Sequence, residues 1–256
     1  MVHVALESPS SREQAARAGA QDFPDGGAPR RRVALVTGGT RGIGAGIVAA
    51  LGTTHHVVVG GRSNAAVSAV VAGLPSASGF LVDLDDEAAT EAAAGSIGEL
   101  SLLVHCAGVV PPREGSVRDR WRAVLETNVV AVVHLTELLL PALRASRGHV
   151  VFVNSGSGLQ AWGDVSGYSA SKFALTSYAD GLRASERGLV RVSSVHPGRV
   201  DTDMQRDLQD RAGRPYQPDE HLTVGAVAAA VRAVVDAPAG AVIESLSIRP
   251  GGGTRG

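Results

Sequence analysis

A tyrosine and a lysine stand four residues apart in the segment YSASK, at Tyr168 and Lys172. On a helix, residues at i and i+4 lie one turn apart on the same face, so the ammonium of Lys172 can approach the phenol of Tyr168. An unperturbed tyrosine, with a pKa of about 10, is a poor base at neutral pH, but a neighbouring positive charge stabilises the phenolate and lowers that pKa. The pair could therefore exchange a proton with a substrate oxygen. Any helix can produce this spacing, so the interpretation depends on whether the chain brings a redox cofactor to the same face.

The elements that would position this pair follow an alternating pattern. Short apolar runs, typical of parallel strands buried on both faces, are separated by Ala- and Leu-rich helical segments such as residues 119–146. This alternation predicts an α/β fold, a single-domain Rossmann-type doubly wound parallel sheet of about seven strands with helices on both faces. The expected strands are residues 33–39, 56–61, 79–84, 100–108, 149–156, 190–198 and 241–248.

A glycine-rich turn, TGGTRGIG, follows the first expected strand. In a doubly wound sheet, ligands bind beyond the carboxyl ends of the strands. Gly38, Gly42 and Gly44 would let the backbone turn tightly and approach a pyrophosphate, which the N-terminus of the next helix stabilises. Glycines can also end a strand for structural reasons alone, but this spacing between a strand and a helix favours a dinucleotide site.

The end of the second expected strand indicates which dinucleotide binds. Sites that prefer NAD place an Asp or Glu there, whereas this chain has two glycines followed by Arg62 and Ser63. Arg62 can bind a phosphate through a charge-assisted fork, and Arg41 in the glycine turn could add a second positive charge. We therefore expect NADP(H), although Arg62 could also be an ordinary solvent-facing arginine.

Taken together, these motifs resemble the short-chain dehydrogenase/reductase family in its compact form, over nearly everything after residue 31. The resemblance rests on the segments TGGTRGIG, LVDLDD, HCAG, ETNVV, YSASK and HPGRVDT, which occur in the family's order. It implies a cofactor site made by Gly38, Thr40, Arg41, Gly42, Ile43, Gly44, Arg62, Ser63, Asp83, Leu84, Cys106, Ala107, Gly108, Tyr168, Lys172, Pro197, Gly198, Val200 and Thr202. His105 and Cys106 depart from the family's asparagine-containing motif, which puts local hydrogen bonding in question.

The resemblance also implies a catalytic set of Asn128, Ser155, Tyr168 and Lys172. Tyr168 would act as general acid in the reductive direction, and Ser155 would polarise the substrate oxygen. Ser157 is a rival for that role, and Ser155 could simply cap a strand end. Asn128 would hold a water that supplies protons to Lys172, or else bond only locally within its helix.

The implied activity is hydride transfer between NADP(H) and a carbonyl or alcohol carbon, which would make this nucleotide-binding chain an oxidoreductase of the ketoreductase type. Alternatives are a non-catalytic NADP(H)-binding sensor or scaffold, or an enzyme acting on an imine, sugar or steroid. We expect a substrate lid at about residues 198–223. The expected pocket residues are Leu159, Gln160, Trp162, Val165, Arg199, Met204 and Tyr216.

Composition and charge indicate which partners, location and domain boundaries to expect. The 256 residues carry a formal net charge of -1, which does not favour nucleic acid or an anionic membrane as a partner. No segment reads as a membrane span or secretory signal, so we expect a cytoplasmic protein with a small-molecule substrate and no metal. Residues 1–31 read as a disordered leader, 32–250 as the catalytic domain and 251–256 as a flexible tail. By analogy with the family, the chain is expected to be a homodimer or homotetramer.

Overall fold

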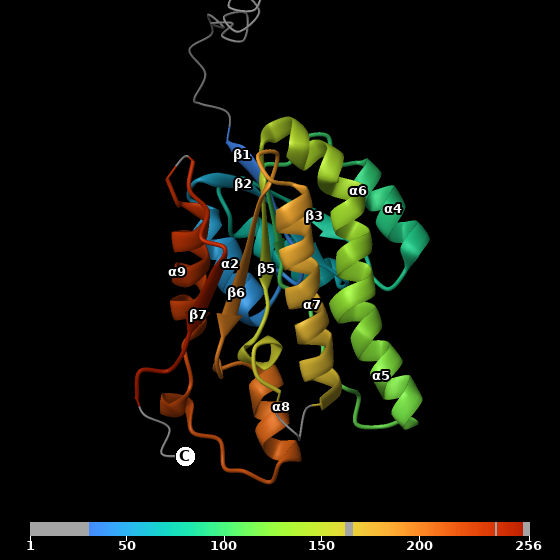
Figure 1. The fold of residues 1–256 in the computed structure, drawn as a ribbon, viewed down its shortest axis with the longest axis vertical. Helices are drawn as coiled ribbons and strands as arrows, with labels where there is room; N and C mark the ends of the chain where they lie inside the picture. Colours follow the sequence, from blue (N-terminus) through green and yellow to red (C-terminus); the bar gives the residue numbers. More distant parts are fainter. Residues whose placement is uncertain (1–30, 162–165, 239, 253–256) are drawn as a thin grey trace, which may run out of the picture. The chain divides into compact units, whose positions relative to one another are not determined.

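The fold is a seven-stranded parallel sheet with helices on both faces (Figure 1). A computed structural model describes residues 31–161, 166–238 and 240–252. The strand order is β3-β2-β1-β4-β5-β6-β7, so the chain changes direction across the sheet between β1 and β4. The strands are β1 (Arg32–Val36), β2 (His55–Gly61), β3 (Ala77–Leu81), β4 (Leu102–His105), β5 (His149–Val153), β6 (Arg191–Pro197) and β7 (Ser245–Ile248). This topology confirms the predicted doubly wound sheet.

Alternate residues of each strand face opposite sides of the sheet, and both sides are apolar. Along β1, Leu35 belongs to one buried cluster, whereas its neighbours Ala34 and Val36 belong to another. The first cluster packs on α4, α6 and α7, and the second packs on α2, α3 and α9. Two covered faces explain why the strand sequences are continuously apolar instead of alternating.

The helices begin at capping residues that the sequence supplies. The side chains of Ser63, Asp86, Ser116, Thr202 and Thr223 each accept a hydrogen bond from a backbone N–H in the first turn of the helix that follows. The helices are α2 (Gly42–Leu51), α3 (Asn64–Ala72), α4 (Glu87–Gly95), α5 (Val117–Leu125), α6 (Ala131–Ser146), α7 (Ser166–Ser185), α8 (Asp203–Arg211) and α9 (Val224–Val235).

Most of the expected strands are shorter than predicted, and three of them bear on the site or the sheet edge. The segment predicted at 100–108 is a strand only over Leu102–His105, the one at 79–84 ends at Leu81, and the one at 241–248 begins at Ser245. Residues 106–108 and 82–84 leave the sheet and line a cavity instead. Apolar content alone could not show where pairing stops, because these residues are also partly enclosed.

One long helix bears on the expectation that no segment is a membrane span. The helix Val117–Ser146, which comprises α5, a π-helical turn η1 (Glu126–Val130) and α6, is long and apolar enough to cross a membrane by length and composition alone. Leu135, Leu139 and Leu143 of this helix are at most 2% exposed and belong to the core cluster on one face of the sheet. The core helix of a globular protein passes the same test, and this packing accounts for its apolar character.

Candidate active site

A cavity of about 270 Å³ opens at the carboxyl ends of β1 to β5. It brings together the glycine turn and the Tyr168–Lys172 pair, which are about 130 residues apart in the sequence. Fifteen of the predicted cofactor residues line it: Gly38, Thr40, Arg41, Gly42, Ile43, Gly44, Arg62, Asp83, Leu84, Cys106, Ala107, Gly108, Tyr168, Lys172 and Thr202. The predicted residues outside the lining are Ser63, Asn128, Ser155, Pro197, Gly198 and Val200. Of these, Ser63 caps α3 and Val200 packs in a small buried cluster.

The glycine turn has the backbone conformation that its sequence requires. Gly38 and Gly42 have φ angles of 63° and 51°, a region that side chains disfavour. A Cβ atom at Gly44 would lie 2.1 Å from the carbonyl oxygen of Gly38, so no larger residue fits. Arg41 occupies the N-cap of α2 without a side-chain bond to the helix. The first-turn N–H groups of α2 therefore remain available to an anion.

Thr37 ties the glycine turn to the end of β4. Its hydroxyl oxygen accepts hydrogen bonds from the backbone N–H groups of Cys106 and Ala107, both at 3.1 Å. The ideal Cβ of Gly38 would lie 2.8 Å from the Cα of Ala107, so these two loops approach as closely as backbone permits. The sequence analysis did not assign Thr37 a role, although its place at the start of the glycine motif was a usable signal.

Two arginines stand at the rim of the cavity, each opposite a carboxylate. Arg62 lies 3.4 Å from Asp83, and Arg41 lies 3.7 Å from Asp203 at the start of α8. All four side chains are at least half exposed, so these ion pairs are weak and solvent-screened. The two guanidinium groups can leave their partners to bind a more strongly charged anion such as a phosphate.

Lys172 is buried next to the phenol ring of Tyr168. Its side chain is on α7, with Nζ 5.6 Å from the centre of the Tyr168 ring, and it donates a 3.4 Å hydrogen bond to the carbonyl oxygen of Val153. Burial lowers the pKa of Lys172 to about 8. Among the described residues, one backbone acceptor holds the buried ammonium, which stays mostly protonated at neutral pH and loses its proton near pH 8.

The pKa of Tyr168 differs from the expectation. Burial raises the pKa of its phenol, and a hydrogen bond with the side chain of Ser155 only partly offsets that effect. In the protein alone, the free-energy cost of removing the phenolate from water exceeds the stabilisation that nearby groups give it. The predicted lowering therefore does not hold for the protein alone.

Asn128 lies in the π-helical turn between α5 and α6 and is 1% exposed. Its Oδ1 accepts a hydrogen bond from the N–H of Val109 at 2.8 Å, and its Nδ2 donates to the carbonyl of Val109 at 2.9 Å and to the hydroxyl of Ser171 at 3.0 Å. Ser171 in turn donates to the carbonyl of Tyr168 at 2.7 Å. Asn128 thus fixes the loop after β4 against the turn of α7 that carries Tyr168 and Lys172. π-helical turns commonly mark functional sites.

Ser155 follows β5 and has a capping role, while its predicted role toward a substrate oxygen stays a prediction. Its hydroxyl accepts a 3.1 Å hydrogen bond from the N–H of Ser157 and so caps a short 3-10 turn, Gly156–Gly158. It also bonds to the phenol of Tyr168. The ring of His196 in β6 donates from Nδ1 to the carbonyl of Ser155 at 3.1 Å.

At the departure from the family motif, the backbone N–H of Cys106 keeps a partner in Thr37, whereas the buried Nδ1 of His105 has no hydrogen-bond partner among the described residues. His105 is 2% exposed, stacks on Phe152 and bonds through Nε2 to the hydroxyl of Thr136 at 2.8 Å. The hydroxyl of Thr136 donates to the carbonyl of Val132, so Nε2 of His105 carries the hydrogen. Burial lowers the pKa of His105 to about 3 and raises that of Cys106 to about 12, so both are neutral.

Several lining residues were not predicted. Gly60 and Gly61 end β2, and Thr127 donates to the carboxylate of Asp85 at 2.9 Å. Such residues carry no motif of their own, and only the convergence of strand ends places them together. The unpredicted lining residues are Thr37, Gly60, Gly61, Phe80, Val82, Asp85, Val109, Thr127, Val153, Asn154 and Asp203.

The predicted substrate residues are only partly assembled. Met204 lines the cavity, whereas Leu159 and Gln160 are exposed and Trp162 and Val165 lie outside the described residues. In the expected lid, Tyr216 donates to Asp201 at 2.5 Å and Arg199 lies 3.7 Å from Glu220. These two polar side chains bond within the lid segment.

Helix α8, which lies in the expected lid segment, is bonded to the loop after β4 through charged side chains. Arg113 donates to Asp207 at 3.0 Å and to Asp210 at 2.6 Å, and Arg211 donates to the carbonyl of Pro111 at 2.5 Å. Ionic attraction thus holds α8 beside the entrance of the cavity.

Comparison with known proteins identifies the family. A family model described as short chain dehydrogenase matches residues 32–213. The chain belongs to the short-chain dehydrogenases.

L-fucose dehydrogenase of Bos taurus is 34% identical over 186 residues, which cover 69% of each protein. Glycine betaine reductase ATRR of Emericella nidulans is 33% identical over 187 residues, 68% of this chain, but the match spans only 15% of that longer protein. A solved structure of an actinorhodin polyketide ketoreductase variant with NADPH superimposes with a TM-score of 0.77 at 25% identity, over 86% of this chain and 97% of that one. This short-chain dehydrogenase therefore shares the fold and family of established oxidoreductases.

Proposed function

We propose that this short-chain dehydrogenase is an NADPH-dependent oxidoreductase that interconverts a carbonyl group and an alcohol. The single observation that carries the proposal is that the glycine turn, the two rim arginines and the Tyr168–Lys172 pair line one cavity. A redox cofactor bound on the glycine turn would thus have a proton-transfer pair beside it. NADPH in the related ketoreductase structure supports the choice of cofactor.

The residues of this chain fit a dinucleotide. The positive φ angles of Gly38 and Gly42, and the space that a Cβ at Gly44 would fill, leave room for a pyrophosphate beside the uncapped N-terminus of α2. Arg41 and Arg62 would bind a 2′-phosphate after exchanging their carboxylate partners for it. When bound, the nicotinamide supplies a hydride to the carbonyl carbon or accepts one from the alcohol carbon.

In reduction, the substrate oxygen gains negative charge as its carbon gains the hydride, and Tyr168 gives the phenolic proton to that oxygen. The hydroxyl of Ser155, already bonded to this phenol, orients the oxygen and the proton donor together. Lys172 stabilises the phenolate that remains, since its Nζ lies 5.6 Å from the ring centre. Asn128 positions the pair through Ser171 and Val109.

The raised pKa of Tyr168 suits the acid role in the resting protein. A buried phenol keeps its proton at neutral pH until negative charge develops on the substrate oxygen. For the reverse reaction, Lys172 must be protonated to favour the phenolate, and its pKa of about 8 sets the upper end of the useful pH range. Oxidation is therefore expected to weaken as the pH rises past that value.

The oligomer and location remain parts of this proposal. Trp121 and Val130 on the long helix and Phe173 on α7 are 39%, 51% and 42% exposed. Two copies could bury this apolar surface against each other, which supports a homodimer or homotetramer. A cytoplasmic location agrees with the soluble cofactor and the single cysteine.

The test is NADPH oxidation by the purified chain, followed optically with ketones, aldehydes, diketones and quinones, beside the Tyr168→Phe variant. Turnover of a carbonyl by the parent and at least about 100-fold less by the variant is the expected result. Equal turnover by both would contradict the role of Tyr168. NADPH binding without turnover of any compound would favour the sensor alternative, and an imine or sugar series would then test the other enzyme classes.

A further inference from the structure

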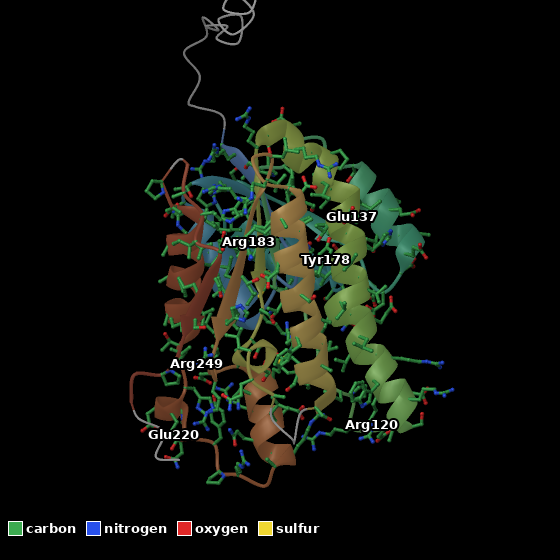
Figure 2. The ribbon with its side chains drawn as sticks, viewed as in Figure 1. Arg120, Glu137, Tyr178, Arg183, Glu220 and Arg249 are labelled. Atoms are coloured by element: carbon green, nitrogen blue, oxygen red, sulfur yellow. The ribbon has the colours of Figure 1, made fainter. Side chains whose placement is uncertain are left out.

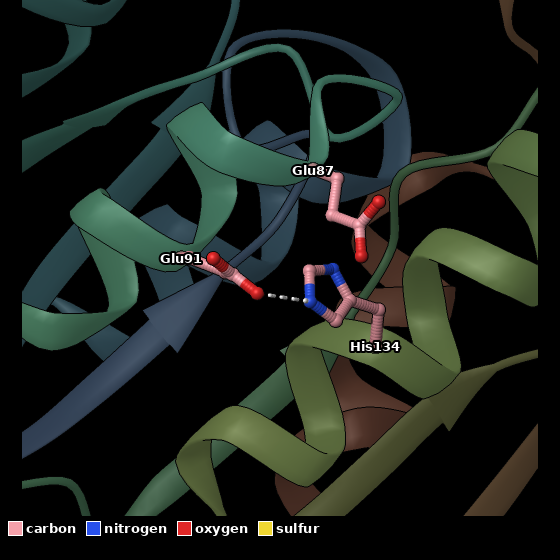
Figure 3. Close-up of side chains that lie close together, drawn as sticks. All are labelled: Glu87, Glu91 and His134. Atoms are coloured by element: carbon pink, nitrogen blue, oxygen red, sulfur yellow. Dashed lines mark ion pairs between the residues drawn. The ribbon is translucent and has the colours of Figure 1, made fainter.

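Two glutamates and a histidine from different helices converge outside the active-site cavity. Glu87 and Glu91 stand one turn apart on α4, and His134 faces them from α6 (Figure 3). One ligand atom from each of the three lies within 4.8 Å of the other two. The Nε2 of His134 is 3.7 Å from a carboxylate oxygen of Glu91. None of the three residues lines the cofactor cavity.

Packing between α4 and α6 fixes the backbone positions that carry these side chains. Ala94 of α4 is buried in the same apolar cluster as Leu135 and Leu139 of α6. The carboxylate of Asp86 caps α4 by accepting from the N–H of Ala89 at 3.0 Å. Because the backbone positions are fixed by packing, only the side-chain torsions of Glu87 and Glu91 must adjust to meet a common ligand.

A buried hydroxyl beside these residues lacks a partner. Thr90 is fully buried, and its Oγ1 has no hydrogen bond among the described residues. Glu87, Thr90 and Glu91 stand at i, i+3 and i+4 on α4, so they share one face of that helix. Buried hydroxyls are rarely left unpaired, so this side of α4 carries an unmet hydrogen-bonding group close in sequence to the two glutamates.

The His134–Glu91 contact does not account for the whole cluster. At 3.7 Å it is a long ion pair, and the carboxylate of Glu87 makes no hydrogen bond or ion pair with any described residue. Two carboxylates and an imidazole around one point leave a negative site that a divalent cation neutralises. An imidazole with two carboxylates favours a borderline transition-metal ion over Mg²⁺ or Ca²⁺, which prefer oxygen ligands alone.

We propose that Glu87, Glu91 and His134 bind one divalent transition-metal ion of the Zn²⁺ class, with water completing the coordination. Metal–ligand bonds of about 2.0–2.2 Å require ligand atoms about 3.4 Å apart in a tetrahedral site. The present separations of up to 4.8 Å need to close by little more than an ångström. Glu91, whose side chain is 56% exposed, has the rotamer freedom to do so.

The metal would act as a structural link between α4 and α6. A neighbouring hollow is lined by Glu87 and His134 and also by Leu84 and Asp85, which line the cofactor cavity too. Metal binding would therefore stabilise the segment after β3, which forms part of the wall of the cofactor cavity. The proposal is independent of the hydride-transfer function, since it concerns residues outside that cavity.

The test uses the full chain, stripped with a chelator and dialysed. Zn²⁺ is titrated by calorimetry, Co²⁺ by its visible absorption, and thermal unfolding is recorded with and without Zn²⁺. We expect one ion per chain and a raised unfolding temperature. His134→Ala and, separately, Glu91→Gln should weaken the dissociation constant by about tenfold or more and remove the thermal shift.

His56→Ala is the matched control, because His56 is a half-buried histidine on β2 that bonds to Ser76 and Ser78. Its Zn²⁺ affinity should stay within about twofold of the parent. Circular dichroism without metal must show that all variants fold. The proposal is overturned if the parent binds no Zn²⁺, if both His134→Ala and Glu91→Gln bind it as the parent does, or if His56→Ala loses it equally.

Discussion

Asn128 offers the sharpest test of how the candidate site is held together. The change is Asn128→Ala, which removes the three hydrogen bonds to the two backbone groups of Val109 and to Ser171. Each net hydrogen bond contributes about 1 kcal/mol, so the free energy of unfolding should fall by about 3 kcal/mol. Because Ser171 is bonded to the carbonyl of Tyr168, turnover should fall as well.

The assay is urea unfolding of the parent and the variant without added ligand, followed by tryptophan fluorescence and circular dichroism. The matched control is Asn64→Ala, since Asn64 is exposed at the start of α3 and its side chain accepts only a 3.4 Å bond from Ser68. This control should change stability by less than about 0.5 kcal/mol. If Asn128→Ala also costs less than about 1 kcal/mol, the loop after β4 does not depend on this side chain and the positioning argument is wrong.

Three further predictions concern the cofactor, a buried ion pair and the N-terminal segment. Arg62→Asp should lower the ratio of NADPH to NADH turnover by at least about tenfold, because it places a second carboxylate beside Asp83 where the phosphate is expected; an unchanged ratio would show that other residues bind the phosphate. Arg144→Ala should lower the free energy of unfolding at neutral pH, because Glu186 is 3% exposed and loses its forked partner. The Arg144 guanidinium holds the pKa of Glu186 below its usual range, so this contribution is present above the unfolded pKa and lost as the pH falls through the folded one. The difference in the free energy of unfolding between parent and variant should therefore shrink as the solution is acidified, and a difference that stays constant would refute the charge argument. Deletion of residues 1–28 should leave turnover and the unfolding midpoint intact, as activity assays and thermal unfolding can check.

Local patterns in the sequence predicted those parts of the site that depend on nearby residues. The turn from Gly38 to Gly44 requires glycine through its own backbone angles and its own carbonyl contacts, so the motif could be recognised without the fold. Likewise, Tyr168 and Lys172 share a face of α7 because of helical geometry alone, and the lysine does lie near the phenol ring. Their pKa values could not be foreseen, because burial depends on what surrounds α7.

Distant contacts explain the predictions that failed or were missing. The lining role of Val109 arises where separate strand ends meet, and nothing in its immediate neighbours marks it, whereas Thr37 stands at the start of the glycine motif but bonds to residues that lie 69 and 70 positions away. Asp83 was predicted only as a cofactor-site residue, and its 3.4 Å contact with Arg62, which is 21 residues earlier, became visible only in the fold. The apolar helix Val117–Ser146 is assigned to the core only once its packing on the sheet is known.

The sequence by itself determined the doubly wound class, the glycine turn and the order of the chemical motifs, because strand and helix periodicities and glycine conformations are local properties. The tertiary structure decided which groups meet. It brought the glycine turn and the Tyr168–Lys172 pair to one cavity, and it brought His134 on α6 to the glutamates of α4. Figure 2 shows the same dependence for Glu137 and Tyr178, which meet across α6 and α7 at 3.2 Å although 41 residues separate them. Such contacts are determined by how the helices pack on the sheet, and no single segment of the sequence specifies that packing.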